Sequence, residues 1–572
     1  MIEEFVVDDN VIMFINEEDD LPNDYNEIKN SSNSKDWYEA VEYELNALKK
    51  NRTWTLVDRP KNKNIITCKY VFRVKRNKEG EIDRFRARLV ARGFSQKRGE
   101  DFNETFAPVA RMTSFRTFLA LAVQFDLLIE QIDVTSAFLH GELSEDIYME
   151  VPDGVQFSGD KVCKLNRPIY GLKQSPRIWN EKLHNYLISL GFEQSKSDYC
   201  VYYHKMKNFE DNFYILIYVD DILLITKHQD RLNHLKQKLQ LVFEMKDSEP
   251  LSHFLGIQVE RDPTSISISQ SKYLEQVLVK CRMQDCRPIS TPLETKIDIY
   301  ELTNSNLLTD NEKYPCRPAI GSLMYAMLCS RPDLCYAIGL LSRFQSKPSK
   351  ALWKHIKHVL RYVKGTIDLK LKFIKNNPYH SPVTVFVKES SFGRRWLRRQ
   401  LIEANKFPLI SYVDASFATS DEEARSTTGV VIKVFGNTIS WYSRRQTITA
   451  LSTMMAEFLA LCEATRDIIY LREYLQFLGI TLTSPTIIFE DNAACIVIAK
   501  DPTNHKGTRQ INTKLFFVRD TIRDKVIDVK QISTDENMAD FFTKSLARPR
   551  FELLRSQLGL VHDTKNIVNF HD

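Results

Sequence analysis

The chain has 572 residues, of which 43% are hydrophobic and 27% charged, ordinary values for a soluble globular protein. This length predicts several domains with ample core. No apolar run reaches the roughly 18 residues of a membrane helix, and the acidic start MIEEFVVDDN lacks the basic segment of a secretory signal. Ten scattered cysteines without a CxxC pair favour reduced thiols in an intracellular protein over a disulfide scaffold or a zinc site.

Charge is unevenly distributed along the chain. The net charge is +5, but residues 1–30 carry ten acidic side chains and one lysine, which leaves +14 on the remainder. The first 35 residues are acidic and rich in Asn and Ser, and we expect a linker or tail there. The basic remainder suits a polyanionic partner, although a solvated basic surface has the same composition.

The first folded segment is predicted to begin at Trp37. The stretch WYEAVEYELNALKKN has the apolar spacing of a helix, and TWTLV and KYVFRVKRNKEGEIDRFRARLVARGF indicate strands with a turn at Glu79-Gly80. The basic side chains of these strands form either a solvated sheet face or a surface for triphosphate and backbone phosphates. The strands carry Lys69, Arg73, Lys75, Arg86, Arg88 and Arg92.

Three carboxylates follow in the next elements. A helix over SFRTFLALAVQFDLL precedes an apolar stretch ending at Asp133, and YGLKQSPRIWNEKLHNYLISLGF predicts a loop and a helix ending at Gly191. In FYILIYVDDILLIT, residues 213–226, Asp220 and Asp221 interrupt two apolar runs. A β-hairpin explains the turn, but adjacent carboxylates beside apolar strands repel each other. A shared divalent cation offsets that repulsion, so the three together predict a metal site for phosphoryl chemistry.

The rest of the chain changes texture twice. Residues from about 230 to 280 predict a helix and then strands through FLGIQVERD and SISISQ, and the stretch to about 375 is mostly helical. The basic patch SSFGRRWLRRQ follows. From about residue 408 the pattern is strand, strand, long helix, strand, helix.

Many ordered motifs over residues 36–560 resemble the Pol polyproteins of copia-type retrotransposons. TFAPVARMTSFRTFLALA, QIDVTSAFLHGEL, IYMEVPDG, CKLNRPIYGLKQSPRIWN and YVDDILL are similar to the reverse transcriptase of that family. GSLMYAMLCSRPDL, VLRYVKGT, STTGVVI, ISWYSRRQ, ALSTMMAEFLAL, FEDNAACI and ENMADFFTKSL are similar to its connection and RNase H. The chain would then be a processed C-terminal product or a fragmentary element copy.

The resemblance implies an α/β and α+β multidomain fold, a right-hand polymerase of fingers, palm and thumb followed by an RNase H-like domain. We expect the following division: 1–35, an acidic linker or tail; 36–280, the reverse transcriptase; 281–407, a connection region; 408–547, the RNase H-like domain; and 548–572, a C-terminal tail. FLGIQV, residues 254–259, resembles a primer-gripping hairpin, although an amphipathic strand explains it equally well.

In the polymerase, the resemblance assigns metal binding and catalysis to Asp133, Asp220 and Asp221, the trio that the residues themselves indicated. Phe138 resembles the aromatic residue that stacks beneath the incoming sugar and excludes a 2′-hydroxyl, with a plain core role as the alternative. Gln174 resembles a residue that hydrogen-bonds the incoming nucleotide, and Arg86 and Arg88 are candidate triphosphate ligands.

In the RNase H-like domain, the resemblance assigns a second metal-binding carboxylate cluster to Asp414, Glu457, Asp491 and Asp540. Any one of them alone would more simply be a solvated surface acid. The chain also departs from the family pattern. The family has Asp-Ala-Asp-Trp where this chain has Asp414-Ala415-Ser416-Phe417, and Glu where it has Met455. Two histidines and an aspartate of the family are replaced by Gln510, Phe516 and Asn512.

We therefore predict an RNA-directed DNA polymerase with RNase H cleavage of the RNA strand of hybrids, using two Mg²⁺ ions per active site, with Mn²⁺ as an alternative. The expected partners are an RNA template, a DNA or tRNA primer, RNA/DNA hybrid, dNTPs, and other Pol and Gag products, with no membrane. The expected location is a cytoplasmic virus-like particle, with the nucleus as an alternative.

Two other functions fit part of the sequence. A catalytically decayed or host-retained copy would bind nucleic acid through a basic cleft without turnover; the RNase H departures favour it and the intact carboxylates oppose it. An RNA-copying RNA polymerase would share the palm, but Phe138 and an attached RNase H oppose it, because a hybrid-cleaving domain is useful only when DNA is made on RNA.

Overall fold

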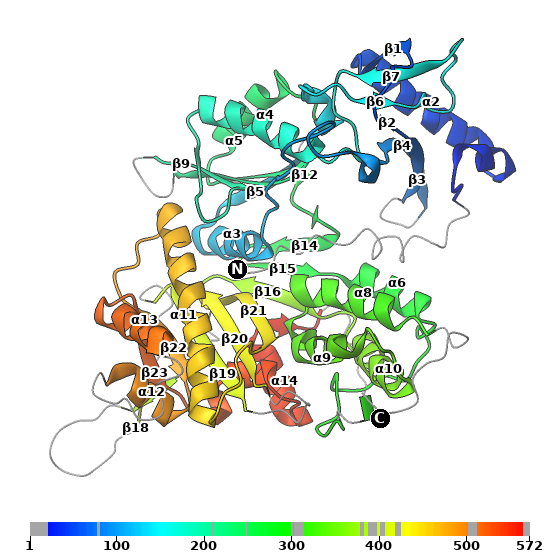
Figure 1. Ribbon diagram of the computed structural model, residues 1–572. Helices are drawn as coiled ribbons and strands as arrows, with labels where there is room; N and C mark the ends of the chain where they lie inside the picture. Colours follow the sequence, from blue (N-terminus) through cyan, green and yellow to red (C-terminus); the bar gives the residue numbers. More distant parts are fainter. Residues whose placement is uncertain are drawn as a thin grey trace.

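A computed structural model gives the fold, with sheets joined by a helix at the centre of the molecule (Figure 1). The expected turn at Glu79-Gly80 and most of the basic patch lie outside the described residues. The structure describes residues 21–76, 81–206, 211–246, 249–298, 301–302, 314–377, 383–386, 397–400, 407–417, 425–501 and 512–563.

The N-terminal elements form the upper right part of Figure 1. Helix α2 (Ser34–Lys50) buries Trp37, Val41 and Leu48, which recur at helical spacing, and packs against the second strand of a long hairpin. The predicted strands are confirmed. The hairpin is β3 (Cys68–Arg76) and β4 (Ile82–Ala91), and the adjacent sheet has the order β1 (Trp54–Asp58), β7 (Lys161–Leu165), β6 (Tyr148–Met149), β2 (Ile65–Ile66).

FYILIYVDDILLIT lies in a six-stranded sheet, which we call the palm sheet, and it is apolar at successive positions because both faces of this sheet are covered. Ile215 and Ile217 face the core that contains Trp179 of α4 (Ser175–Ser189), while Tyr214 and Leu216 face the core that contains α3 (Met112–Phe125). Helix α5 (Gln229–Gln240) shares the first of these cores. The strand order is β12 (Glu249–Pro250), β5 (Leu128–Asp133), β11 (Asp221–Thr226), β10 (Phe213–Tyr218), β9 (Val201–His204), β8 (Glu193–Gln194).

A five-stranded sheet and a group of helices follow the palm sheet, as the helical pattern to about residue 375 predicts. The FLGIQV stretch forms the hairpin of β13 and β14, with Leu255 and Gly256 at positive φ in its turn. The sheet order is β13 (His253–Phe254), β14 (Ile257–Asp262), β15 (Ser265–Ser269), β16 (Lys370–Ile374), β24 (Leu560–Val561). The helices are α6 (Ser271–Lys280), α8 (Cys316–Cys329), α9 (Cys335–Leu341) and α10 (Lys350–Lys364).

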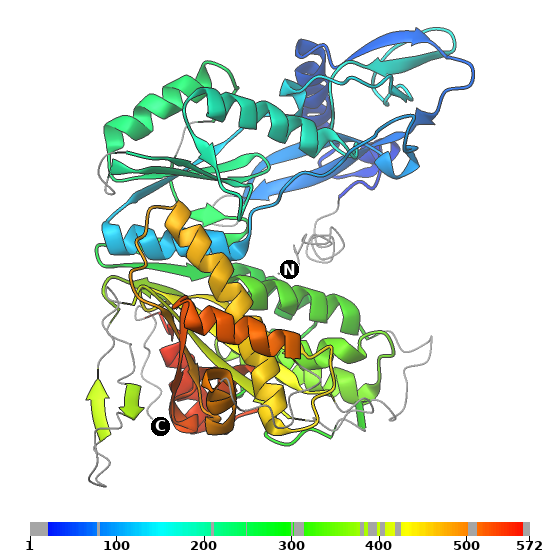
Figure 2. The ribbon, with the colours of Figure 1, turned by 60° about the vertical axis from the view of Figure 1, so that its left-hand side comes forward.

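A mixed five-stranded sheet, which we call the third sheet, lies below α3 in Figures 1 and 2. Its first three strands are antiparallel, and β22 and β23 run parallel to β19. Three strands precede the long helix where the sequence pattern indicated two, because only Phe435 and Gly436, both at positive φ, separate β20 from β21. The order is β21 (Asn437–Arg445), β20 (Thr427–Val434), β19 (Leu409–Ser416), β22 (Thr486–Glu490), β23 (Ile527–Gln531).

Helices cover this third sheet. Helix α11 (Thr453–Phe477) crosses it, together with α12 (Ala493–Lys500) and α13 (Asn512–Arg523). The segment 548–572, predicted as a tail, contains α14 (Arg548–Gln557) and β24, which pairs with β16; the boundary at 547 stays a prediction. A two-stranded ribbon, β17 (Val383–Phe386) and β18 (Leu397–Gln400), extends beside the sheet (Figure 2).

A close backbone approach holds the motif YGLKQSP against the end of β4. Gly171 has φ +89°, and a Cβ there would lie 2.0 Å from the Ala91 carbonyl oxygen. Gly99 has a similar φ of +83°, but a Cβ there would meet nothing within 4 Å. Alanine at Gly99 would therefore meet only the cost of the left-handed backbone, whereas alanine at Gly171 would meet that cost and a steric clash as well.

We predict that Gly99→Ala costs only the left-handed strain of about 1–2 kcal/mol, whereas Gly171→Ala costs clearly more, about 3 kcal/mol or above, because backbone must also move. Urea unfolding of both variants, followed by tryptophan fluorescence, measures the difference. Equal midpoints for the two variants would contradict the close approach.

Candidate active sites

The two aspartates of YVDD lie at the turn between β10 and β11. Tyr218 pairs with Asp221, which leaves Val219 and Asp220 as the turn, and Val219 has φ 55°. A β-branched residue in this region is strained. The Trp179 indole N–H donates to the Val219 carbonyl oxygen at 2.6 Å and holds the strained peptide against α4.

Strand register brings the third carboxylate beside the turn. Asp133, the last residue of β5, is the direct antiparallel partner of Asp221, so both side chains leave the same face of the sheet. Gln131 donates from Nε2 to Asp221 Oδ1 at 3.0 Å, and the Tyr170 hydroxyl lies 3.5 Å from Asp220 Oδ2. Burial raises the pKa of Asp221, and the neighbouring charge of Asp220 adds to the effect.

Lys246 is a member of this site that the sequence reasoning missed. Its ammonium forms an ion pair with Asp133 Oδ2. Burial, followed by the repulsion of Lys75, Arg86 and other cations, lowers the pKa of Lys246 to about 8. A divalent cation bound to Asp133 would have to displace this ammonium. Lys246 is 113 residues from Asp133 in sequence and only the fold joins them.

A small pocket lies between the β3–β4 hairpin and Phe138. Phe138 packs edge-on against Tyr170, with ring centroids 4.6 Å apart, and the Arg88 guanidinium lies 4.3 Å from the centre of the Tyr170 ring. Arg86 is also in the lining, and burial lowers its pKa. Three of the four predicted nucleotide-binding residues thus share one pocket. The lining is Glu44, Leu48, Arg86, Arg88, Leu89, Ser136, Phe138, Leu139, Ile169 and Tyr170.

Gln174 is not in that lining. Its side chain is 1% exposed. Nε2 donates to the Asp101 carbonyl oxygen at 2.8 Å, and Oε1 accepts from Gln96 Nε2 at 3.0 Å. A role for Gln174 toward a nucleotide stays a prediction, and it would require exchange of at least one of these contacts.

The third sheet carries a second acidic site. Asp414 on β19, Glu457 on α11 and Asp491 after β22 have ligand oxygens within 4.8 Å of one another. It is the one group of this kind in the described parts of the chain; Asp133, Asp220 and Asp221 do not converge as tightly. Three of the four predicted acids are therefore brought together here.

The electrostatics of this acidic site fit a divalent cation. Burial and the charge of Asp540 raise the pKa of Asp414 to about 6, and burial with the charges of Glu490 and Asp414 raises the pKa of Glu457 to about 11. Glu457 Oε2 and Glu490 Oε2 are buried without a hydrogen-bond partner in the described structure. Glu490, 0% exposed, was missed because it reads as the last residue of an apolar strand.

Asp540, the fourth predicted acid, has cationic partners instead. It is 0% exposed, and it pairs with Arg550 of α14 and, at 2.7 Å, with the Lys544 ammonium. The Thr543 hydroxyl donates to Asp414 Oδ2, so the Asp540 segment still borders the cluster. Gly429 permits this approach, because a Cβ there would lie 2.8 Å from the Ala539 carbonyl oxygen.

The residues that depart from the family pattern differ in their position and burial. Ser416 ends β19, two residues after Asp414. Met455 is 2% exposed in the first turn of α11, so an apolar thioether fills that position. Phe516 is 55% exposed on α13, and Gln510 lies outside the described residues.

Comparisons with known proteins relate the chain to one family. A family model described as reverse transcriptase (RNA-dependent DNA polymerase) matches residues 51–295. The Pol polyprotein from transposon TNT 1-94 of Nicotiana tabacum is 37% identical over 551 residues, 95% of this chain and 39% of that protein. The Pol polyprotein from transposon RE1 of Arabidopsis thaliana is 34% identical over 92% of this chain and 34% of that protein. A solved foamy viral protease-reverse transcriptase in complex with double-stranded DNA is 12% identical, with a TM-score of 0.43 over 87% of this chain and 69% of that one.

Residues 51–295 belong to the reverse transcriptase family, and more than nine tenths of the chain align with the Pol polyproteins of copia-type retrotransposons. The predicted family and the mixed α/β multidomain fold are confirmed. The chain spans between about a third and two fifths of the two Pol polyproteins described above. No helix among the described residues is long and apolar enough to cross a bilayer.

The raised pKa of Asp414 predicts how the second site responds to pH and metal. Its folded-state pKa of about 6 exceeds the ordinary 3.8, so its contribution to stability is present at low pH and is lost as pH rises through 6. A divalent cation reverses the effect because it favours the ionised carboxylate. Relative to Asp414→Asn, the metal-free chain should therefore lose thermal stability between about pH 4 and pH 7.

Differential scanning fluorimetry of both proteins with Mg²⁺, Mn²⁺ or EDTA measures this. At about pH 7.5, metal should raise the midpoint of the unmodified chain and leave Asp414→Asn almost unchanged. A midpoint that ignores metal in both proteins would contradict a cation site at Asp414.

Proposed function

We propose that this chain is an RNA-directed DNA polymerase whose C-terminal part cleaves the RNA strand of RNA/DNA hybrids. The observation that carries the polymerase is the register of β5 and β11, which sets Asp133 opposite Asp221 next to the Asp220 turn. Membership of the reverse transcriptase family supports the same function.

The polymerase residues would divide the work by position. Asp133, Asp220 and Asp221 would hold two Mg²⁺ or Mn²⁺ ions, which supply activation of the attacking hydroxyl and stabilisation of the leaving oxygen when bound. Gln131 and Tyr170 orient two of these carboxylates. A primer 3′-hydroxyl would therefore lie at the end of the palm sheet that carries these carboxylates.

Side chains that line the pocket beside this end would bind the triphosphate of a deoxynucleotide. Arg86 and Arg88 offer guanidinium groups that match phosphate oxygens, and the packed Phe138 ring closes one wall. A ring in that place would leave little room for a 2′-hydroxyl, so we assign Phe138 to sugar selection. The alternative of a core phenylalanine predicts no effect on sugar choice.

The second acidic site supports hydrolysis of a phosphodiester. Asp414, Glu457 and Asp491 would hold the metal ions, which lower the pKa of a bound water when present. Asp540 would act from the edge of the cluster, where Lys544 and Arg550 balance its charge.

The partners follow from this chemistry and are part of the proposal. They are an RNA template, a DNA or tRNA primer, the RNA/DNA hybrid, dNTPs, and the Gag and other Pol products of the element. The proposed location is a virus-like particle in the cytoplasm, with the nucleus as the alternative.

A second candidate function is binding of nucleic acid without catalysis. The ion pair of Lys246 with Asp133 and the substitutions at Ser416 and Met455 favour it. Such a protein would bind a primed template with salt-dependent affinity and incorporate nothing.

Primer extension on an RNA template with Mg²⁺ and dNTPs separates the two functions. We predict that Asp220→Asn lowers extension at least about 100-fold, because it removes a charge that stabilises the transition state. Asp230→Asn, an exposed aspartate on α5, is the matched control and should extend like the unmodified chain. Extension by Asp220→Asn at the control rate would disprove the metal assignment.

For the RNase H-like site, we predict that Glu457→Gln abolishes cleavage of a labelled RNA strand in a hybrid while extension continues. A neutral amide cannot supply the negative charge that two cations require. The control is Glu463→Gln on the same helix, outside the cluster. If the unmodified chain leaves the hybrid intact with both Mg²⁺ and Mn²⁺, the RNase H assignment fails and the polymerase assignment is unaffected.

A further inference from the structure

Helix α3 lies between the palm sheet and the third sheet in both ribbon views (Figures 1 and 2). Its residues from Thr113 to Gln124 are all buried. Phe118 meets Tyr214 of the palm sheet at 5.6 Å, and Phe125 meets Phe435 of the third sheet at 5.4 Å between ring centroids. One hydrophobic core therefore runs without a break from the palm into the third sheet.

Arg116 stands at the centre of this core. It is 4% exposed, and its guanidinium donates to three carbonyl oxygens: Ile439 at 2.6 Å, Leu328 at 2.6 Å and Cys329 at 3.0 Å. It also lies 4.0 Å from the centre of the Trp441 ring. Three separate parts of the chain, α3, the end of α8 and β21, thus meet at one side chain.

The charge of Arg116 makes this arrangement specific. Its hydrogen-bond acceptors in the described structure are carbonyl oxygens, and two of them belong to the negative end of the α8 dipole. Burial lowers the pKa of Arg116 to about 9, so the charge is retained at neutral pH. A buried cation held in this way is costly to expose, and separation of the two sheets would leave the carbonyl groups and the cation without partners.

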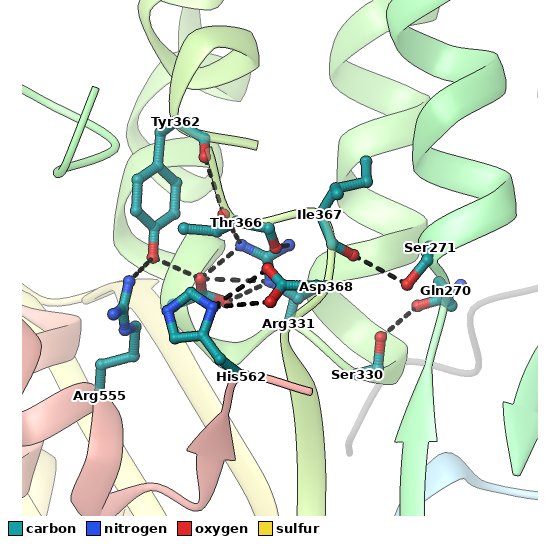
Figure 3. Close-up of polar contacts among 11 residues, drawn as sticks. Gln270, Ser271, Ser330, Arg331, Tyr362, Thr366, Ile367, Asp368, Arg555 and His562 are labelled. Atoms are coloured by element: carbon teal, nitrogen blue, oxygen red, sulfur yellow. Dashed lines mark hydrogen bonds and ion pairs between the residues drawn. The ribbon is translucent and has the colours of Figure 1, made fainter. Parts of the chain in front are cut away.

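The segment directly after α8 continues the junction toward the C-terminal helix (Figure 3). Arg331 and Asp333 form a fully buried ion pair at 2.7 Å, and Asp333 accepts from the Tyr362 hydroxyl of α10 at 2.7 Å. That hydroxyl accepts from Arg555 of α14 at 3.2 Å. Helix α14 also carries Arg550, the partner of Asp540, so the junction reaches the border of the second acidic site.

A separate contact joins the far end of α11 to the palm. The Tyr214 hydroxyl donates to the Leu478 carbonyl oxygen at 2.8 Å, and Tyr203 packs edge-on against Phe477 at 5.6 Å. Glu457 lies on the same helix, which is continuous from Thr453 to Phe477. The helix that carries one acidic site is therefore fixed at its other end to the sheet that carries the other.

We propose that Arg116 is a positioning residue that locks the palm sheet and the third sheet into one rigid body and thereby fixes the spacing of the two acidic sites. The effect on cleavage rests on the proposed function. A hybrid whose primer end sits at Asp133, Asp220 and Asp221 would then be cut at a narrow set of positions, set by the distance between the sites.

The test maps RNA cuts on a hybrid with a recessed primer 3′ end, with Mg²⁺ and without dNTPs. The unmodified chain should give a narrow cluster of cuts that moves with the primer end. In Arg116→Lys the cuts should spread, with a loss of about twofold or more at the main position, because an ammonium cannot satisfy three carbonyls and stack on Trp441. Arg472→Lys is the control, since Arg472 bonds Ser484, Thr486 and Leu482 within one domain.

Calorimetry gives a readout that needs no activity. The unmodified chain should unfold the palm and the RNase H-like part in one transition, and Arg116→Lys in two. Tyr214→Phe, with the palm-internal Tyr202→Phe as its control, repeats the test if Arg116→Lys does not fold. Two transitions in the unmodified chain, cuts unrelated to the primer end, or an unchanged pattern in the folded junction variants would overturn the proposal. An uncut hybrid with a single transition would refute only the RNase H assignment.

Discussion

The burial of α3 between two sheets is the constraint on which the rest of the structure depends. Its apolar residues complete the core beneath Tyr214 and Leu216 of the palm and also the core beside β21, so each sheet would lose part of its cover without it. Burial on all sides leaves Arg116 no route to water, and its carbonyl partners come from the neighbouring elements. A single helix thus joins the two halves of the molecule through packing and through one charge.

The two acidic sites differ in how far neighbouring cations offset the repulsion between their carboxylates. In the palm, cations stand close to the carboxylates, and the ammonium of Lys246 already offsets Asp133. In the third sheet, Asp414, Glu457 and Asp491 lie close together and their pKa values rise, while Lys544 and Arg550 form their ion pairs with Asp540. A divalent cation would therefore relieve more repulsion at the second site, whereas at the first site it would have to displace the Lys246 ammonium.

Family membership and physical reasoning bear on different questions. Relatives aligned over more than nine tenths of the chain establish what kind of protein it is. Catalytic turnover would depend on local features such as Met455 in the first turn of α11 and the ion pair at Asp133.

The sequence by itself determined the helix at Trp37, the hairpin around Asp220 and Asp221, and the choice of Asp133 as their partner, because apolar periodicity and turn residues are local signals. Tertiary structure alone decided that Lys246 neutralises Asp133, that Glu490 is buried behind Glu457, and that Arg116 joins three elements. Contacts between residues far apart in the chain leave no periodic trace. They arise only when the sheets and α3 have packed, and the same packing set the burial that shifts the pKa values of both sites.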